Sequence, residues 1–139
     1  MLVSWAVPKG PTLDPDVRRL AVRVEDHPVD YFDFEGVISA DRYGGGDVIV
    51  WDWGTWALTG ATDPLAAVIA GDVHFDLAGE KLRGHFALVR RGQQRGREQW
   101  LLIHKHDECA VEGWDPEAHP RSVKSGRTND ELRADPVAP

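Results

Sequence analysis

The stretch VHFDLAGEKLRGHFALVRRGQQRGREQWLLIH, residues 73–104, decides the fold class of this chain. It contains short runs rich in apolar and β-branched residues at 73–77, 85–90 and 99–104, with glycines and charged residues between them. Such runs are typical of strands separated by turns in an all-β protein. We predict that residues 91–97, RGQQRGR, form the loop of a hairpin joining the last two strands.

The same pattern continues toward the N-terminus. Further candidate strands lie at residues 3–7, 20–24, 48–53 and 55–59. Leu20, Val22 and Val24 alternate with Ala21 and Arg23, which is the pattern of a strand whose two faces differ in environment. We therefore predict an all-β fold with minor α content, a small closed or partly open β-barrel.

One short helix and a C-terminal tail complete the predicted architecture. The helix is expected at residues 62–70, because Thr62 or Asp63 can cap it, Pro64 stands early and Gly71 follows its end. After Asp107 the sequence is rich in Asp, Pro, Gly, Ser and Arg and poor in apolar residues. We predict a barrel domain at residues 1–108 and an extended linker or tail at 109–139.

The composition indicates a single compact domain. The chain has 139 residues, of which 42% are hydrophobic and 28% charged, so it is too apolar for wholesale disorder. Tryptophan is enriched, with six copies. Large aromatic side chains suit pleated surfaces and bury much area, so we expect most of these indoles in the core or in half-buried sheet positions.

Composition also argues against several classes of protein. The lone Cys109 permits neither an internal disulfide nor a cysteine-based zinc site, and a reducing cytoplasm fits it best. No stretch approaches the length of a membrane span and the first residues lack the pattern of a secretory signal, so we expect no membrane association. The net charge of −7 disfavours a protein that coats nucleic acid indiscriminately.

One stretch is nevertheless locally basic. Between Lys81 and Lys105 there are seven lysines and arginines against a single acid, Glu98. Two interpretations stay open: a solvated charged hairpin, or arginines that contact a polyanion.

Lys9, Arg19, His27 and Tyr31 form the set of polar residues with the clearest chemical potential. Lys9 lies between Pro8 and Gly10 on a constrained turn, and Arg19 opens a strand. Each of the four can donate a hydrogen bond to a phosphate oxygen, and a histidine can also pass a proton to a leaving oxygen. The spacing alone equally suits a surface turn at His27 before Pro28.

Three further groups are weaker candidates. The acids at 25–35 suit either a magnesium or manganese site or a solvated loop with local ion pairs. His104 and His106 can share one strand face and hold a transition metal, yet no third ligand is evident. The run Gly44-Gly45-Gly46 suits a phosphate cradle or a tight turn before a strand.

Many short motifs, taken in order, resemble one known family. They are SWAVPKGP (4–11), VEDHP (24–28), DFEG (33–36), YG (43–44), VWD (50–52), GTW (54–56), KLRG (81–84) and WLLI (100–103). Together they resemble the 3'-phosphoesterase module of bacterial DNA ligase D, and residues 119–127 are similar to the connector that precedes the ligase domain in the actinobacterial type. The combination is specific because it spans residues 3 to about 108.

The resemblance implies a small β-barrel that trims DNA 3' ends in double-strand break repair by end joining. Such modules remove a terminal ribonucleoside and then the 3'-phosphate, leaving a 3'-hydroxyl. The implied phosphate-binding residues are Lys9, Arg19, His27 and Tyr31, with His27 and Tyr31 in catalytic roles. The implied cofactor is Mn²⁺, and the implied partners are DNA 3' ends, the ligase and polymerase domains of ligase D, and Ku.

Two departures from the family pattern shape the expectation. The family's metal ligands, two His and an Asp, lie on a strand before the WAVPK segment, whereas Met1 stands four residues before Trp5. We therefore expect no metal ligands in this chain, incomplete catalysis, and self-association through an exposed sheet edge. At residues 39–43, SADRY, the family usually has Pro, Gly and Glu before the Tyr, and Arg42 reverses that charge.

Two other functions are retained as alternatives. One is a non-catalytic module that binds DNA 3' ends or docks repair partners through the hairpin at 90–97. The other is a tryptophan-rich β module for a different ligand, such as a sugar.

Overall fold

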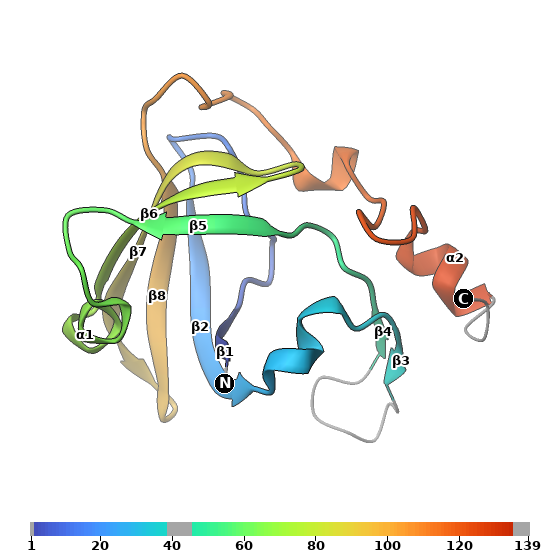
Figure 1. Cartoon of the computed structure of the whole chain (residues 1–139), viewed down its shortest axis with the longest axis horizontal. Helices are drawn as coiled ribbons and strands as arrows, with labels where there is room; N and C mark the ends of the chain where they lie inside the picture. The colour runs from blue at the N-terminus through green and yellow to red at the C-terminus, as the bar shows by residue number, and fades with distance from the viewer. Residues whose placement is uncertain (1, 39–45, 135–139) are drawn as a thin grey trace.

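The computed structural model describes residues 2–38 and 46–134 of the chain. Six antiparallel strands form the main sheet, in the order β1-β2-β8-β7-β6-β5. Their bounds are β1 Leu2–Ala6, β2 Arg18–His27, β5 Gly54–Leu58, β6 Asp72–Gly79, β7 Arg83–Gln94 and β8 Arg97–His104. A small second sheet pairs β3 Gly36–Ile38 with β4 Gly46–Val48. The main sheet curls into a half-barrel with β1 and β5 at its edges (Figure 1), so the predicted all-β, partly open barrel is confirmed.

Two strand predictions differ from the structure. Residues 49–53 are not a strand, because their polar groups bind elsewhere: the Val50 amide donates to Glu35 and the Val50 carbonyl accepts from Val123. The predicted loop at 91–97 is instead a tight two-residue turn, since β7 extends to Gln94 and β8 begins at Arg97. The alternation of polar and apolar residues did not reveal this extension, because both strands are exposed near the turn.

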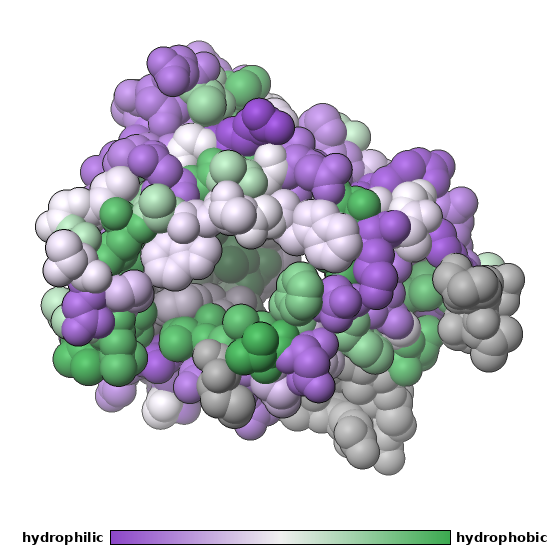
Figure 2. All heavy atoms as spheres, viewed as in Figure 1, coloured by the Kyte–Doolittle hydropathy of each residue, from purple (hydrophilic) through white to green (hydrophobic). Residues whose placement is uncertain are grey.

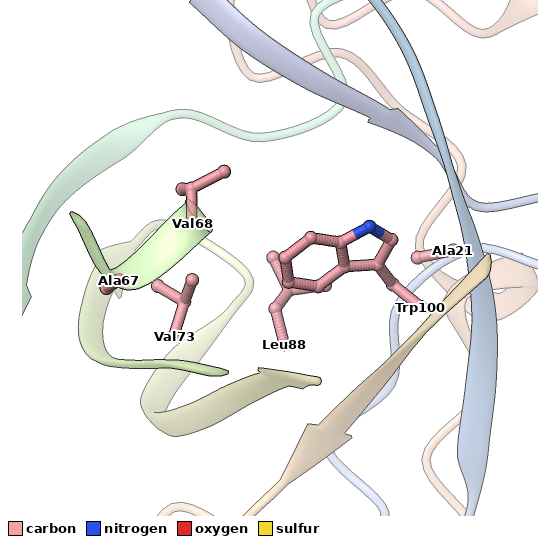
Figure 3. Close-up of a cluster of buried hydrophobic side chains, with 6 residues drawn as sticks. All are labelled: Ala21, Ala67, Val68, Val73, Leu88 and Trp100. Atoms are coloured by element: carbon pink, nitrogen blue, oxygen red, sulfur yellow. The ribbon is translucent and has the colours of Figure 1, made fainter. Parts of the chain in front are cut away.

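The main hydrophobic core lies inside the curl of the sheet. Trp100 is fully buried there with Ala21, Val73, Leu88 and the helix residues Ala67 and Val68 (Figure 3). Burying a large apolar side chain stabilises a fold by about 1.5–3 kcal/mol, so this cluster is the main source of stability for the sheet. Trp5 packs edge-on against Trp100 with 5.3 Å between ring centroids, which holds β1 onto the same core.

Helix α1, Pro64–Ala70, forms where the sequence predicts it. The Asp63 side chain accepts hydrogen bonds from the amides of Leu65 (3.1 Å) and Ala66 (3.4 Å), and Gly71 ends the helix with a left-handed φ of 77°. The helix packs on β6 and supplies part of the apolar lining of a hollow between β1 and β5. Figure 2 shows this face with a hollow whose floor and lower rim are apolar.

The C-terminal segment packs on the sheet domain. Residues 109–139 were predicted as an extended tail, but within the described part they contain a 3₁₀ turn, η2 Pro116–Ala118, and a second helix, α2 Asn129–Ala134. Ser122 and Leu132 are only 5% and 3% exposed. Composition did not reveal this, because the segment is held largely by polar bonds to distant residues. A domain boundary at residue 108 stays a prediction.

None of the helices that the structure describes is long and apolar enough to cross a bilayer.

Candidate functional site

His27 is positioned by an irregularity between the first two strands. Leu2 pairs with His27 and Ser4 pairs with Val24, so two steps along β1 face three steps along β2. The extra residue in β2 is a bulge, which re-aims the side chains that follow it. As a result the His27 ring lies against Ser4, with 2.7 Å between Nδ1 and the Ser4 hydroxyl.

This contact indicates which nitrogen of His27 carries the proton in the neutral ring. The Ser4 hydroxyl donates its only proton to the Leu2 carbonyl at 2.9 Å. It can therefore only accept from His27, so Nδ1 is the protonated nitrogen and Nε2 has a lone pair. A neutral His27 in this form can accept a proton through Nε2, and a protonated one can donate from it.

Tyr31 is brought to His27 by the short helix that follows β2. Pro28 biases the chain away from α-helix, and the 3₁₀ helix η1 covers Val29–Asp33. The Tyr31 ring stacks on His27 with centroids 5.3 Å apart, and the Phe34 ring stacks on Tyr31 at 5.1 Å. The three rings therefore form one column that fixes the Tyr31 side chain.

The column borders a hollow of about 410 Å³ that is open to solvent. His27 and Tyr31 line it together with residues 48–52, which include Trp51 and Asp52. A pair of hydrogen-bonding side chains beside an aromatic wall suits a small anion attached to a flat organic group.

Asp52 makes the part of the lining at residues 48–52 rigid. Its carboxylate accepts hydrogen bonds from four backbone amides, those of Trp53, Glu80, Lys81 and Leu82, at 2.9–3.2 Å. Gly79 permits this close approach, because a Cβ there would lie 2.5 Å from the Asp52 carboxylate. A turn between β6 and β7 is thereby tied to the loop that lines the hollow.

The C-terminal segment holds the loop that carries Tyr31. Glu35, at the end of that loop, accepts from the Ser122 hydroxyl and from the Val50 amide. Burial acts to raise the pKa of Glu35, but hydrogen bonds from Ser122, Ser125 and Val50, together with Lys124, lower this pKa below its ordinary value. Glu35 is therefore a structural carboxylate.

A lysine on the sheet domain completes the same attachment. Lys81 donates to the His119 carbonyl at 3.1 Å and to the Arg121 carbonyl, and its ammonium lies 4.4 Å from the centre of the Trp51 ring. Burial lowers the pKa of Lys81, while Asp52 and Glu80 act in the opposite direction. The segment thus reaches both parts of the lining of the hollow.

Comparison with known proteins identifies the family. Residues 1–90 match the family described as the DNA Ligase D 3'-phosphoesterase domain. The chain belongs to this family. The resemblance seen in the sequence motifs is therefore confirmed for the module, and the actinobacterial type stays a prediction.

Similar full-length proteins are much longer than this chain. It is 50% identical over 130 residues to the "Multifunctional non-homologous end joining protein LigD" of Pseudomonas aeruginosa, a match that covers 91% of this chain and 15% of that protein. It is 41% identical over 101 residues to the "Multifunctional non-homologous end joining DNA repair protein LigD" of Mycobacterium tuberculosis, covering 73% and 12%. With the relative from Mycolicibacterium smegmatis the identity is 37% over 112 residues, covering 78% and 14%.

Of the four predicted phosphate-binding residues of this family member, the described contacts join two, His27 and Tyr31. His27 and Tyr31 are stacked, whereas Lys9 is exposed on the turn after β1 and lines a different hollow, which shares only Trp51 with the first. Arg19 stands eight residues before His27 in β2, which is about 26 Å along a regular strand. The described contacts join neither Lys9 nor Arg19 to the His27 column, and convergence of all four on one anion stays a prediction.

Arg19 does carry one unusual feature. Its Nε is buried and has no hydrogen-bond partner among the described residues, although Asp14 is near enough to interact electrostatically. Such a buried donor is costly when left unpaired, which marks Arg19 as a group with spare binding capacity toward the interior of the half-barrel.

The weaker candidate residues at 25–35, His104 and His106 make contacts within the protein. His104 is 1% exposed and is bonded to the carbonyls of Lys105 and Arg83, while His106 is largely exposed near Asp16. Among the acids at 25–35, Glu35 and Asp33 contact the C-terminal segment. Of the glycine run, residues 44 and 45 lie outside the described residues, as does the SADR departure at 39–42.

Sequence reasoning missed the residues that orient the pair. Ser4 was not singled out, because the bulge that sets it beside His27 leaves no periodic signal. Phe34 could have been found: it lies three residues after Tyr31, and residues at that spacing eclipse one another in a 3₁₀ helix.

Proposed function

We propose that this chain is a DNA 3'-end-processing phosphoesterase domain that removes a terminal ribonucleoside and a 3'-phosphate, leaving a 3'-hydroxyl during repair by end joining. The observation that carries the proposal is the stacked pair of His27 and Tyr31, with Ser4 orienting His27, beside an open hollow in a chain of this family. A terminal phosphate is the anion that such donors suit.

The proposed reaction is hydrolysis of a phosphoester. Water attacks phosphorus, the bond from phosphorus to the 3'-oxygen breaks, and the products are a 3'-hydroxyl and inorganic phosphate. His27 transfers a proton through Nε2 or contacts a phosphate oxygen, because Nδ1 is bound to Ser4. Tyr31 donates to a phosphate oxygen and orients it.

Manganese is proposed as the cofactor only because of the family resemblance. Within residues 2–38 and 46–134 there is no group of three or more His, Cys, Asp and Glu side chains placed to hold a metal. Carboxylate and imidazole occur there as pairs, such as Asp72 with His74 and Asp76 with His85. These donors do not by themselves fit a manganese ion, so the roles given to His27 and Tyr31 do not involve it.

The proposed partners follow the family and the sheet edges. The proposed partners are DNA 3' ends, the ligase and polymerase domains of ligase D, Ku, and a second copy of this chain. The proposed location is the cytoplasm. Self-association is supported by the edge positions of β1 and β5, which offer unpaired backbone groups to another strand. Light scattering after size exclusion should show species larger than a monomer, and a clean monomer would contradict this part.

The enzymatic proposal is tested with a primer–template bearing a 3'-phosphate, with manganese added, by measuring released phosphate. Incomplete catalysis stays a prediction, so a low parent rate is expected. Losing a proton-transfer group typically costs about 10²–10⁴-fold in rate, and His27→Ala should lower the phosphate release of the parent chain by a factor in that range. His106→Ala is the matched control, since it also removes an imidazole but from a side chain 74% exposed. Equal rates for His27→Ala and the parent chain would exclude the assigned role.

The same assay distinguishes the non-catalytic DNA-binding alternative from the phosphoesterase proposal. Binding of DNA ends without phosphate release, in the parent chain with manganese present, would favour a non-catalytic end-binding module.

A further inference from the structure

Another hollow lies at the turn end of the β7–β8 hairpin, and none of its lining residues lines the hollow beside His27. It has a volume of about 670 Å³ and is lined by Arg23 and Glu25 of β2 and by Arg95, Arg97 and Glu98 of the hairpin. The proposed phosphoesterase reaction uses none of these residues. Three guanidinium groups and two carboxylates therefore share one concave surface that has no assigned role.

The turn at the tip of the hairpin presents an arginine in an unfavourable backbone conformation. Arg95 has φ 55° and Gly96 has φ 76°, so both residues of the turn are left-handed. Such turns favour Asn, Asp and Gly, and a left-handed conformation costs other residues about 1–2 kcal/mol. Arg95 is the single non-glycine residue with positive φ in the described chain. A strained residue that persists on the surface points to a function for its side chain.

The lining of the hollow has a net positive charge, with three arginines against two glutamates. Glu98 is engaged inside the hairpin, because it accepts from the Trp100 indole at 3.0 Å and lies 3.7 Å from the Arg23 guanidinium. Arg95 and Arg97 are exposed on the rim. A guanidinium presents a planar fork of donors that matches a phosphate group, so the hollow suits an anion with spaced phosphates.

The hollow is connected to the candidate active site through β2. Arg23 and Glu25 line the hollow, and His27 of the same strand lines the site. Four residues of a strand span about 13 Å, and phosphates of one DNA strand are about 3.4 Å apart along the helix axis. A duplex with its terminal phosphate at His27 would therefore bring phosphates about four nucleotides away to the level of Arg23.

We infer that the hollow between β2 and the β7–β8 hairpin binds the phosphodiester backbone of DNA a few nucleotides from the 3' end. Arg95 and Arg97 contribute the principal phosphate contacts. The distance from the 3' end rests on the proposed function, whereas binding of the backbone does not.

The test is equilibrium binding of the full chain to a labelled primer–template, by fluorescence anisotropy across a salt series. The variant is Arg95→Asn with Arg97→Gln, because Asn tolerates the left-handed position and both changes keep polar side chains. Each phosphate contact contributes about 0.9 to the slope of log K against log salt, so we expect a slope shallower by about 2 and weaker binding at low salt. Circular dichroism verifies that the variant is folded.

The matched control is Arg18→Gln, which removes an exposed arginine from the opposite end of β2. It should leave both the slope and the affinity close to those of the parent chain. An unchanged slope in the double variant overturns the inference. An Arg18→Gln effect of half that of the double variant or more also overturns it, because the single lost charge would then act through net charge rather than through this surface.

Pairs of DNA that differ only in a 3'-phosphate or a 3'-hydroxyl separate this inference from the proposed function. The hairpin variant should weaken binding to both ends by the same factor. Parent-chain discrimination between the two ends, together with an unaffected hairpin variant, would retain the phosphoesterase proposal and reject the DNA surface. Suppose instead that the hairpin variant loses DNA binding, while the parent chain neither distinguishes the two ends nor releases phosphate. This result would retain the DNA surface and reject the phosphoesterase proposal.

Discussion

The six-stranded sheet and the region that faces it are held together by different forces. The sheet has continuous backbone ladders and a core around Trp100. The facing region consists of residues 29–38 and 46–52 with the C-terminal segment 110–134. It has only the short β3–β4 ladder, and its parts are joined by isolated bonds such as that between Ser122 and Glu35. His27 belongs to the sheet and Tyr31 to the facing region. The position of His27 is therefore set by the sheet, whereas the position of Tyr31 depends on the bonds that hold the facing region.

This contrast teaches that the geometry of the site depends on residues outside the family match. The match covers residues 1–90, whereas the groups that hold the Glu35 loop lie at residues 119–133. A shortened chain could keep the sheet and still lose the position of Tyr31.

The largest expected effect is on the sheet. Trp100 is completely buried, and replacing a buried tryptophan by alanine costs about 3–5 kcal/mol. We expect Trp100→Ala to lower the thermal midpoint by roughly 10 °C or more. Trp56→Ala is the matched control, because this indole is 53% exposed on the edge strand β5. Similar losses for both variants would show that the core is not where the stability lies.

A smaller effect, confined to the facing region, is expected from Ser122→Ala. The change leaves Glu35 and the amides of Lys124 and Ser125 without their hydroxyl partner, at a cost of about 1–3 kcal/mol. Hydrogen exchange should accelerate at 46–50 and 122–134 and stay unchanged in β6 to β8. A uniform acceleration over the whole chain would contradict the division into two regions.

Acid should loosen the facing region before the sheet. The folded pKa of Glu35 is lowered, so its stabilisation is present above the ordinary value of 4.5 and is lost as the pH falls through the lower folded value. Asp14 acts in the same direction, because hydrogen bonds from Gly113 and Asp16 lower its pKa. Tryptophan fluorescence and hydrogen exchange between pH 6 and 3 report the order of loss, and Glu35→Gln should weaken the pH dependence. Simultaneous loss of both regions would count against the distinction.

The smallest effect is expected from Arg121→Gln. Arg121 pairs with Glu131 at 2.8 Å, but the two side chains are 63% and 50% exposed. Exposed ion pairs contribute about 0–1 kcal/mol, so the midpoint should move by a few degrees at most. A loss as large as that of Ser122→Ala would mean that this pair, rather than the buried hydroxyl, anchors the segment.

Local rules predicted much of the sheet and the helix. The run that became β6 alternates apolar and polar residues, the run that became β8 is apolar from Trp100 to Ile103, and Asp63, Pro64 and Gly71 mark the ends of α1 within nine residues. His27 and Tyr31 were predicted from residue type and resemblance, and the structure places their rings in contact. Their catalytic roles stay predictions.

Long-range contacts could not be predicted in the same way. The bond between Ser122 and Glu35 joins residues 87 positions apart, and the partner of His27 lies 23 positions away across a bulge. No local pattern encodes such pairs, because many polar residues in each segment could have formed them.

The sequence by itself determined most strands of the main sheet, helix α1, the family and the kinds of donor that can meet a phosphate. The tertiary structure alone decided the Nδ1–H form of His27, the packing of the C-terminal segment and the grouping of arginines around the β7–β8 turn. Strand and helix patterns are local because backbone hydrogen bonding and alternation act over a few residues. The environment of a side chain depends on which distant segment is folded against it.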